Sequence, residues 1–480
     1  MAFLTGLFRF VYRARYRALA GLPGPPPSFP FGNALRFKGR RPWEVCAELQ
    51  SEYGGVCLVW LMGTPVVVVN DAEAVERILE SRRSDYYKDG PCPALRPVLT
   101  MSSPNINNGE EWRRKRAASA LTQPWAGAWI AAQLGPVTAH LGREAAALAA
   151  RSATRPEPML PLMQRWICDL FSIMAIGRPL EDERYRDFLE LATRGSVRML
   201  SNKPFGPELD EAGVSARGRW QGLFRAAIER AQRDGSRAPE RSDLVGFTRA
   251  HGTSLSMDDE AAELGNLFFG GGFSVSSTIV HALWQFTHNP EAARRLTAAL
   301  DDLGDVDCAK DFARVDGCVA LDRFVRESFR VHPAVPLFTR RVQEDGATEL
   351  GGVTLPGNTM VFLTSWFLHK DPAHWHGPGR SSPEAFDPER WDAACIAANP
   401  LGSGHFFPMG GGPRMCLGWE LALATIKMTL FSLLRDWDVE VGLGQPYDAG
   451  EELFFGVRMP NGLLARVRPR GPLRRVAATQ

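Results

Sequence analysis

The sequence lacks several features that would narrow its function at once. It has eight cysteines among 480 residues, but no C-x-x-C pair and no secretory h-region, so we expect reduced thiols in a cytoplasmic protein. The net charge is only +2, which argues against nucleic-acid binding by the whole chain. We also find no low-complexity linker, charge run or internal repeat. These absences indicate a soluble globular protein without an obvious division into domains.

The N-terminal segment, residues 1–21, contains no run long enough to cross a membrane. Residues 1–8 are mostly apolar and arginines follow at positions 9, 13, 15 and 17, whereas a spanning helix needs ~20 apolar residues. A basic amphipathic helix on a membrane surface is one interpretation. A frayed or packed terminal segment is the other. Prolines then crowd residues 22–30, which predicts a stiff, extended stretch.

A glycine-rich stretch near the C-terminal end leads to one cysteine. Residues 410–412 are all glycine, which permits unusual backbone angles and the close approach of a flat ligand. Cys416 follows, at the start of an apolar helix predicted from Leu417 to about Leu434. Amide N–H groups at a helix N-terminus favour a thiolate, a soft ligand that suits iron. A buried free cysteine after a glycine loop is the alternative interpretation.

A second group of three glycines lies inside a predicted helix. Ser256 is followed by acidic residues, which predicts a helix start. The helix is expected to run about 30 residues, or roughly 45 Å, to Pro290. Gly270, Gly271 and Gly272 each cost about 1 kcal/mol relative to alanine inside a helix. That cost predicts a local distortion or the close approach of a ligand.

Two weaker motifs place charged residues on helix faces. Trp112 and Arg116 are four residues apart, so an indole N–H and a guanidinium can together hold a carboxylate. The three basic residues between them, 113–115, would point elsewhere, as a docking patch for an acidic partner or as a solvated face. A plain basic helix turn is the alternative interpretation. Glu327 and Arg330 are three residues apart and can pair, although a surface ion pair has the same pattern.

Other stretches predict elements rather than chemistry. Residues 55–60 and 65–69 predict a β-hairpin, and Asp71 predicts the cap of the next helix. Residues 84–108 have the composition of an irregular binding loop, and residues 452–467 predict a second hairpin. A group of histidines admits two interpretations, a metal site or an ordinary loop cluster: His369, His374 and His376.

The glycine-rich stretch resembles the haem-binding loop of the cytochrome P450 superfamily, whose pattern is F-x-x-G-x-R-x-C-x-G. The matching positions are Gly412, Arg414, Cys416 and Gly418. Met409 occupies the place of the phenylalanine, where a thioether would tune the iron potential. The motif at Trp112 resembles the family's W-x-x-x-R. The motif at Glu327 resembles its E-x-x-R, which an arginine in residues 386–391, Arg390, would complete.

This resemblance implies a mainly α-helical fold with a small β-rich lobe, in a single domain over residues 22–480 with a proline-rich hinge at 22–30. Haem b, iron protoporphyrin IX, would lie between the central helix and the loop of Cys416, which would ligate the iron. Four residues would hold its propionates: Trp112, Arg116, Arg340 and Arg414. Three residues would form a structural triad: Glu327, Arg330 and Arg390. The substrate pocket would include Gly270, Val335, Pro336, Leu337 and Phe454.

The central helix departs from the family's pattern, A/G-G-x-D/E-T-T/S. Gly270 and Gly271 fall on the two small positions, Phe273 on the acid and Ser274 on the alcohol, so Ser274 and Phe273 replace the pair that usually delivers protons. Water or a substrate hydroxyl would complete the relay, or the enzyme uses peroxide or rearranges an oxidised substrate. A shifted register is the third explanation, but it would not restore an acid, because none occurs between Gly265 and Trp284.

The resemblance implies a monooxygenase of secondary metabolism that inserts one oxygen atom from O2 into a terpenoid, steroid, fatty acid or polyketide. Because no flavin or iron–sulfur segment is recognised, electrons are expected from a separate donor, such as a ferredoxin whose reductase uses NAD(P)H. The protein is expected to be a monomer with at most weak peripheral contact to a membrane. Two alternatives stay open: a peroxygenase, isomerase or dehydratase of the same fold, and a haem-thiolate binding protein without turnover.

Overall fold

The computed structural model describes most of the chain. The described residues are 17–81, 83–88, 108–200, 211–234, 243–306, 311–377, 379–442, 444–445 and 463–471. Some predicted features lie outside these residues: Phe454, Cys92, Cys308, residues 1–16 and most of the loop at 84–108.

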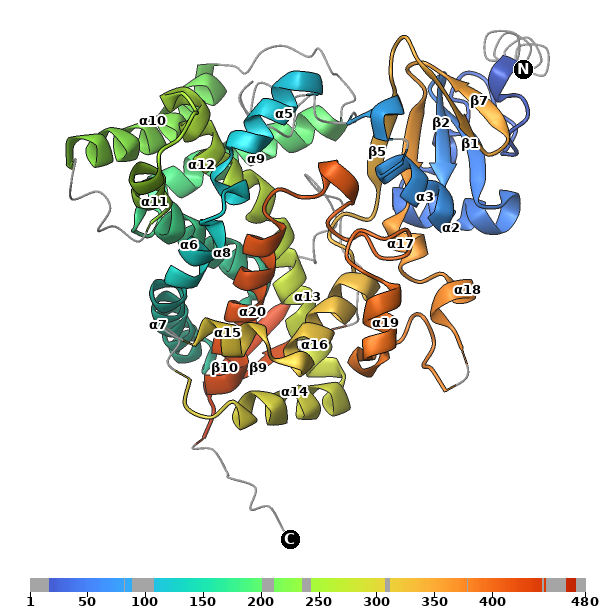
Figure 1. The fold of residues 1–480 in the computed structure, drawn as a ribbon. Helices are drawn as coiled ribbons and strands as arrows, with labels where there is room; N and C mark the ends of the chain where they lie inside the picture. Colours follow the sequence, from blue (N-terminus) through green and yellow to red (C-terminus); the bar gives the residue numbers. More distant parts are fainter. Residues whose placement is uncertain are drawn as a thin grey trace. The chain divides into compact units, whose positions relative to one another are not determined.

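The chain divides into two compact units. Unit 1 comprises Met1–Pro93, Arg330–Ala385 and Asp392–Cys416, and unit 2 comprises Ala94–Phe329, Phe386–Trp391 and Leu417–Gln480. Each unit therefore combines separate stretches of sequence, and the single domain predicted over residues 22–480 stays a prediction. The predicted fold class, mainly α with a small β-rich lobe, is confirmed (Figure 1).

Unit 1 is built on a five-stranded sheet with the order β1-β2-β8-β5-β3. Its strands are β1 (Val56–Leu61), β2 (Thr64–Val69), β3 (Tyr86–Tyr87), β5 (Phe338–Val342) and β8 (Met360–Leu363). β1 and β2 are antiparallel, with Val56 opposite Val69, which confirms the first predicted hairpin. β2 and β8 are parallel. A separate two-stranded sheet pairs β6 (Ala347–Leu350) with β7 (Val353–Pro356).

The β1–β2 hairpin is buried on both faces. Side chains alternate between the faces of a strand, so Leu58 and Val67 join one apolar cluster with α3 (Ala72–Leu79). Val59 and Val66 join another cluster, with Leu49 of α2 (Pro42–Tyr53). Burial on both faces explains the nearly continuous run of valines. The Asp71 carboxylate accepts the Ala74 N–H at 2.7 Å, which confirms the predicted helix cap.

The other helices of unit 1 are short. They are α17 (Ser365–Leu368), α18 (Pro372–Trp375), α19 (Ala393–Ala398) and the 3-10 helices η1 (Arg17–Leu19), η2 (Ala34–Arg36), η3 (Arg83–Asp85) and η7 (Gly412–Arg414). The last of these, η7, belongs to the predicted haem-binding loop. Irregular backbone around such short turns makes up much of the chain that approaches Cys416.

Unit 2 consists mainly of helices. They are α5 (Gly109–Ala118), α6 (Ala126–Ala132), α7 (Leu134–Ser152), α8 (Met159–Ile176), α9 (Asp182–Leu200), α10 (Glu211–Asp234), α11 (Leu244–His251), α12 (Met257–Gly271), α13 (Ser274–His288), α14 (Pro290–Asp302), α15 (Phe312–Asp316), α16 (Val319–Val331) and α20 (Trp419–Asp436), with the 3-10 helices η4 (Ala120–Thr122) and η6 (Pro388–Arg390). The last residues of α16 belong to unit 1.

A three-stranded sheet of unit 2 has the order β4-β10-β9. β10 (Leu464–Pro469) is antiparallel to β9 (Trp437–Val441) and to β4 (Glu157–Pro158). The strand expected at residues 452–458 in the second hairpin lies outside the described residues. The second strand of that predicted hairpin corresponds to β10. Among the described residues, β10 pairs with β4 and β9, which come from distant parts of the chain.

Two helical stretches are long and apolar enough to cross a membrane, Met159–Ile176 and Met257–His288. Their windows are 83% and 67% buried inside the protein, as expected for helices of a protein core. α8 packs against α7, α12 and α13, so these stretches supply the apolar interior of unit 2.

Candidate functional site

The glycine-rich loop of unit 1 has a backbone that other residues do not readily adopt. Gly410 and Gly412 have φ angles of +71° and +60°, in the left-handed region that favours glycine. A Cβ atom on Gly412 would also lie 2.0 Å from the backbone oxygen of Leu79. The Cys416 N–H donates to the Met409 carbonyl at 2.8 Å. These contacts hold the backbone that leads to the cysteine.

Cys416 differs from the other described cysteines. It is exposed, whereas the five others are buried: Cys46, Cys57, Cys168, Cys318 and Cys395. Burial raises the pKa of Cys57 to about 12, which keeps that thiol protonated and unreactive. The helix that follows, α20, begins at Trp419 rather than at the predicted Leu417. Cys416 therefore precedes the helix, and Gly418 is its N-cap residue.

Two arginines of unit 1 belong to the predicted propionate set. Arg340 lies in β5 with only 5% of its surface exposed, and its Nη1 donates to the Thr339 carbonyl at 2.9 Å. Arg414 ends the turn η7 and is half-buried. Val335 and Leu337, which the resemblance places in the pocket, are half-buried just before β5. Unit 1 thus carries the thiol and two cations of the predicted site.

Helix α5 of unit 2 carries the other predicted propionate ligands. Trp112 and Arg116 are half-buried on this helix, so the predicted helical spacing is confirmed. We expected Lys115 to point away with Arg113 and Arg114 as part of a basic surface. That is wrong for Lys115, which is buried and pairs with Glu111 at 3.0 Å and with Asp259 at 3.6 Å.

A buried carboxyl group ties the chain after α5 to the central helix α12. Glu263 accepts hydrogen bonds from the Ser119 hydroxyl and from the Ala120 N–H, the latter at 3.1 Å. Burial raises the pKa of Glu263 to about 7, so near neutral pH the side chain is partly protonated. Together with the Lys115 ion pair, this contact fixes α5 to α12 and so sets the direction of Trp112 and Arg116.

The predicted distortion of the central helix is confirmed. The expected single helix is interrupted at Gly272 and Phe273, between α12 and α13. A Cβ atom on Gly271 would lie 2.5 Å from the ring of Phe171, so Gly271 is required by packing against α8. A Cβ atom on Gly270 would meet nothing within 4 Å. Close packing therefore explains Gly271 and Gly272, while Gly270 faces open space.

Ser274 begins α13 and is accessible. Its hydroxyl donates to the Gly270 carbonyl at 2.8 Å, and the Ser276 hydroxyl donates to the Gly272 carbonyl at 2.6 Å. These bonds satisfy carbonyl groups at the helix interruption. The Ser274 oxygen keeps lone pairs that can accept a hydrogen bond, and rotation of the hydroxyl would free its proton.

Phe273 is held by aromatic packing. Its ring stacks on Phe188 of α9, with centroids 5.4 Å apart and planes at 27°. Phe188 also contacts Trp220 of α10 at 5.6 Å and Phe268 of α12 at 6.3 Å. The residue at the usual acid position is thus anchored in an apolar cluster. Sequence reasoning missed Phe188, because nothing in its local pattern marks a contact with α13.

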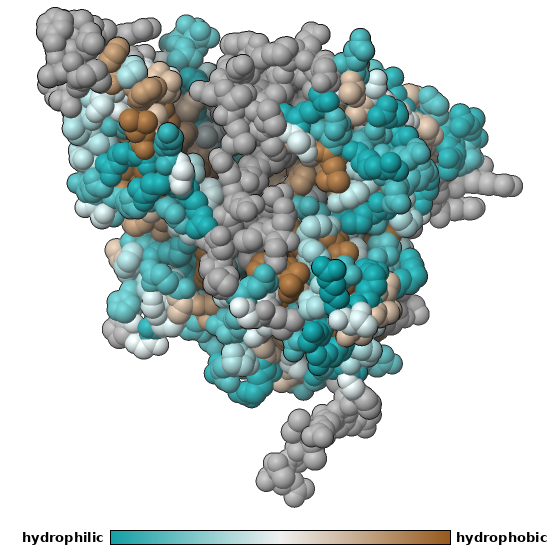
Figure 2. Space-filling view, turned by 180° about the vertical axis from the view of Figure 1, so that it is seen from behind, coloured by the Kyte–Doolittle hydropathy of each residue, from teal (hydrophilic) through white to brown (hydrophobic). Residues whose placement is uncertain are grey.

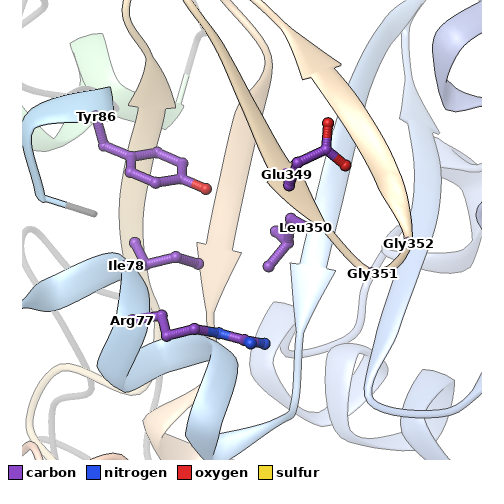
Figure 3. Close-up of a pocket in the computed structure, with 7 residues that line it drawn as sticks. All are labelled: Arg77, Ile78, Tyr86, Glu349, Leu350, Gly351 and Gly352. Carbon is purple, nitrogen blue, oxygen red and sulfur yellow. The ribbon is translucent and has the colours of Figure 1, made fainter. Parts of the chain in front are cut away.

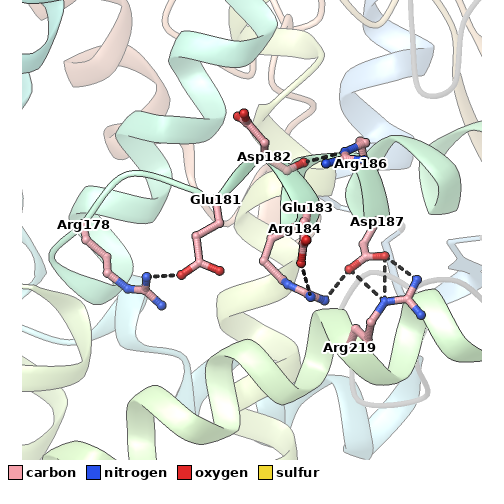
Figure 4. Close-up of polar contacts among 8 residues, drawn as sticks. All are labelled: Arg178, Glu181, Asp182, Glu183, Arg184, Arg186, Asp187 and Arg219. Carbon is pink, nitrogen blue, oxygen red and sulfur yellow. Dashed lines mark hydrogen bonds and ion pairs between the residues drawn. The ribbon is translucent and has the colours of Figure 1, made fainter.

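Ion pairs beside this cluster join α9 to α10. Asp187 is buried and contacts Arg184 of its own helix and Arg219 of α10, whose Nη2 lies 2.6 Å from Oδ1 (Figure 4). Asp187 and Arg219 directly precede Phe188 and Trp220 in the sequence. The polar and aromatic pairs therefore join the same stretches of the two helices.

The predicted structural triad is buried. Glu327 is fully buried and accepts from the Asp387 N–H at 2.8 Å and the Trp391 indole N–H at 2.9 Å. The Nε atom of Arg390 lies 3.7 Å from Glu327. Arg330, also fully buried, donates to the carbonyl groups of His369, Pro383 and Ala385. Glu327 and Arg330 bind backbone groups of the irregular chain at 369–391, to which Arg390 itself belongs, in keeping with the structural role that the resemblance implies.

The histidines near residue 370 do not form a metal centre. Among the described residues, no three or more His, Cys, Asp or Glu side chains lie together in a group that could hold a metal ion. His369 accepts the Phe407 N–H at 3.0 Å, so it supports the start of the glycine-rich loop. His374 stacks on His405 at 3.7 Å and bonds Asn399 at 2.7 Å. The role of His369 was missed because its partner is 38 residues away in the sequence.

A pocket of about 200 Å³ on unit 1 involves none of the predicted site residues. It is lined by Arg77 and Ile78 of α3, Tyr86 of β3 and residues 349–352 of the β6–β7 hairpin (Figure 3). Arg77 and Glu349 add opposite charges to its walls. This pocket lacks a nucleophile, thiol or histidine, so we assign it no chemistry.

The residues present fit a haem group bound through a thiolate. The donor is the exposed sulfur of Cys416, on a loop whose backbone is constrained. Within unit 1, the guanidinium groups of Arg340 and Arg414 suit a carboxylate of such a group. This donor set is the one expected for haem-thiolate chemistry.

Comparison with known proteins identifies the family. Residues 22–464 match the family model described as Cytochrome P450. The chain is 25% identical to carnosic acid synthase of Rosmarinus officinalis, over 95% of this chain and 94% of that protein. It is also 25% identical to thromboxane-A synthase of Mus musculus, over 88% and 86%. A match to iridoid oxidase of Catharanthus roseus is 29% identical but spans 48% of this chain and 42% of that relative.

The family match supports a haem cofactor, a separate supply of electrons and the general chemistry of a haem-thiolate monooxygenase. The chain belongs to the cytochrome P450 family.

Proposed function

We propose that this enzyme inserts one oxygen atom from O2 into a C–H or C=C bond of an apolar small molecule of terpenoid, steroid, fatty acid or polyketide type. The observation that carries the proposal is the exposed thiol of Cys416 on its constrained loop, set against five buried cysteines. An exposed thiol is available as a ligand, and a buried one is not.

Haem b ligated by Cys416 would supply the redox chemistry that activates dioxygen. Arg340 and Arg414 of unit 1 and Trp112 and Arg116 of unit 2 would bind its carboxylates. Met409, at the usual phenylalanine position, would cover the sulfur with a thioether. The protein supplies orientation and exclusion of water around the reacting carbon.

Ser274 is the group that we propose to hold a proton at the reaction site. Its accessible hydroxyl can accept from water and donate after leaving the Gly270 carbonyl. Phe273 forms a wall and carries no proton. We therefore propose that water or a substrate hydroxyl replaces the missing acid.

Electrons would come from a separate donor, a ferredoxin reduced at the expense of NAD(P)H. Arg113 and Arg114 are exposed on α5, the helix that carries Trp112 and Arg116. Two exposed guanidinium groups at this place suit an acidic partner. Lys115 is excluded from that surface by its burial.

We also propose weak peripheral contact with a membrane. Four of the exposed large apolar residues among those described lie between residues 29 and 62: Phe29 at 36% exposure, Phe31 at 40%, Leu35 at 58% and Met62 at 63%. The Met62 N–H donates to the Phe31 carbonyl at 3.3 Å, so the two lie side by side. Apolar surface also gathers at the upper left of Figure 2, over unit 1. Loss of flotation with liposomes in a Phe31→Ser, Met62→Ser variant would support this contact.

A second candidate function follows from Phe273. A peroxygenase, isomerase or dehydratase does not need the proton relay for dioxygen, and a phenylalanine fixed by Phe188 suits such a site. A haem-thiolate binding protein without turnover is the remaining alternative.

The test is turnover of a lipid and terpenoid library with ferredoxin, reductase and NAD(P)H, with peroxide alone in a parallel arm. The proposal expects product only when electrons and air are supplied, and none from Cys416→Ala. Product from peroxide alone, or rearranged product without reductant, would establish the second candidate. Haem binding without any product across the library would favour the binding protein.

A further inference from the structure

Lys370 is a shielded lysine of unit 1 that lacks an acidic partner. Lysines are rarely buried unless a carboxylate pairs with them. The buried Lys115 has two such partners, and the Nζ atom of the buried Lys427 lies 2.9 Å from Asp316 and 3.0 Å from Asp322. Lys370 follows α17 and is half-buried. Among the described residues it forms no ion pair, and its two contacts are of another kind.

A carbonyl group and an indole ring hold the amine of Lys370. Its Nζ atom donates to the Val331 carbonyl at 3.3 Å and lies 3.1 Å from the centre of the Trp366 ring. A carbonyl oxygen and a ring face both accept an N–H group, whether the amine is neutral or protonated. A neutral amine held in this way therefore keeps a lone pair that neither contact uses.

The charges around Lys370 favour the neutral amine. Burial lowers the pKa of Lys370 well below its ordinary value, and the guanidinium of Arg330 lowers it further. Glu384 and Glu44 act in the opposite direction, but neither forms an ion pair with Lys370, and Glu44 pairs with Arg41 at 3.0 Å. A lysine that is neutral near neutral pH is a nucleophile.

A shielded hydrogen-bond donor in the same cluster lacks an acceptor. Trp43 of α2 is only 4% exposed, and its ring centre lies 6.0 Å from that of Trp366. Its indole N–H has no hydrogen-bond partner among the described residues. Such a donor costs about 1–3 kcal/mol, and in native proteins it usually has a partner outside the polypeptide. Trp366 thus has both a nucleophilic amine and an unpartnered donor as neighbours.

We propose that Lys370 is a modification site whose amine binds carbon dioxide reversibly as a carbamate. The lone pair of Nζ attacks the carbon of CO2 and forms an N–C bond, one C=O electron pair moves onto oxygen, and a proton leaves the nitrogen for water. The product is an anion, which the positive charge of Arg330 favours, and its oxygens are acceptors for the Trp43 N–H. Haem and electrons take no part, so the reaction is independent of the proposed oxidation.

The surroundings select a small and uncharged electrophile. Lys370 and Trp366 are both half-buried, so a linear molecule of three atoms reaches the amine more readily than an acyl group on a large carrier. Lys115 and Lys427 do not compete for CO2, because their carboxylate partners favour an ammonium group, which has no lone pair to donate.

The test measures carbamate on the haem-loaded full chain after equilibration with CO2 and bicarbonate at neutral pH. Triethyloxonium ion traps carbamates as ethyl esters, which peptide mass spectrometry then assigns to individual lysines. We expect the trapped fraction at Lys370 to exceed that at the exposed Lys38 and the paired Lys427 by at least about tenfold. CO2 should also raise the Tm of the wild type but not of Lys370→Arg, because a ligand of the folded state alone stabilises it.

The variant Trp43→Phe keeps an aromatic ring and removes the N–H donor. It should lower the carbamate fraction at Lys370 by about three- to tenfold. The rate of labelling by cyanate, which measures the free amine alone, should stay the same.

A carbamate fraction at Lys370 no higher than at Lys38 or Lys427 would overturn the proposal. So would a rise in Tm with CO2 that persists in Lys370→Arg, since the bound CO2 would then lie elsewhere. An unchanged carbamate fraction in Trp43→Phe would overturn the part assigned to the indole N–H.

Discussion

The two glycine triplets look alike in the sequence but are required for different reasons. In the loop of unit 1, Gly410 and Gly412 have positive φ angles, and Gly412 has no room for a Cβ atom beside the Leu79 backbone. In the central helix of unit 2, Gly271 and Gly272 are needed for close packing, and Gly270 faces open space. The loop triplet shapes the backbone before the cysteine, whereas the helix triplet provides a close helix contact and, at Gly270, open space.

Among substitutions in the two glycine triplets, Gly412→Ala is expected to lower stability the most. Its positive φ and a Cβ atom 2.0 Å from a backbone oxygen should destabilise the enzyme by roughly 2–5 kcal/mol. Urea unfolding and iron content per chain measure this, and we expect iron to be lost. Gly39→Ala is the matched control, because Gly39 has φ +68° but nothing within 4 Å. Equal effects of the two variants would show that backbone conformation alone, not close packing, requires Gly412.

The stability of the two units that contain the glycine triplets should change with pH in opposite directions. In unit 2, burial raises the pKa of Glu263 to about 7. A raised carboxyl pKa stabilises the fold below the unfolded value of about 4.3, and this stability is lost as pH rises through 7. Glu263→Gln keeps an acceptor for Ser119 and cannot ionise. It should therefore raise stability at pH 8 by on the order of 2 kcal/mol and change little at pH 5, as seen by Tm.

In unit 1, burial lowers the pKa of His332 to about 3 and of His405 to about 4. A lowered histidine pKa stabilises the fold above the unfolded value of about 6.5, and this stability is lost as pH falls toward 4. Hydrogen exchange at pH 5 and pH 8, corrected for intrinsic rates, should show β2 less protected in acid. Glu263→Gln should increase protection in α12 at pH 8 alone. If protection changed with pH in the same direction in both units, the assignment of these pH effects to Glu263 in unit 2 and to His332 and His405 in unit 1 would be contradicted.

Gly271→Ala should have a smaller effect than Gly412→Ala. The new methyl group would press on the ring of Phe171, which costs about 1–3 kcal/mol and is offset by about 1 kcal/mol of helix propensity. A double-mutant cycle with Phe171→Leu measures the contact. The combined variant should recover at least half of the loss. No coupling between the two positions would mean that Gly271 is not held by this packing.

Gly270→Ala should have the smallest effect on stability. Its Cβ atom would meet nothing within 4 Å, and alanine favours a helix by up to about 1 kcal/mol. The Tm should stay the same or rise slightly, while KM for bulky substrates should rise more than KM for slim ones. A clear loss of stability would contradict the view that Gly270 faces open space.

Local patterns in the sequence were sufficient for several parts of the fold and the site. The caps at Asp71 and Ser256 and the first hairpin depend on neighbouring residues, and the structure confirms each. The helical spacing of Trp112 and Arg116 is confirmed for the same reason. The distortion at the central glycines was predicted because glycine carries a known cost inside a helix.

The features that the sequence did not reveal depend on distant contacts. The burial of Lys115 results from Asp259, and the fixed ring of Phe273 results from Phe188 on another helix. The support of the loop by His369 depends on Phe407 in the same way. No short window contains both partners of such a contact, so neither spacing nor periodicity can predict it.

The most direct test of the account is the source of the oxygen atom in the product. Product masses would be measured after turnover with labelled dioxygen, ferredoxin, reductase and NAD(P)H, for the wild type and Ser274→Ala. We expect labelled product that depends on electrons, with less product per NAD(P)H consumed in Ser274→Ala. Unlabelled or rearranged product, or turnover that does not need electrons, would contradict it and would mean that Phe273 marks a different chemistry.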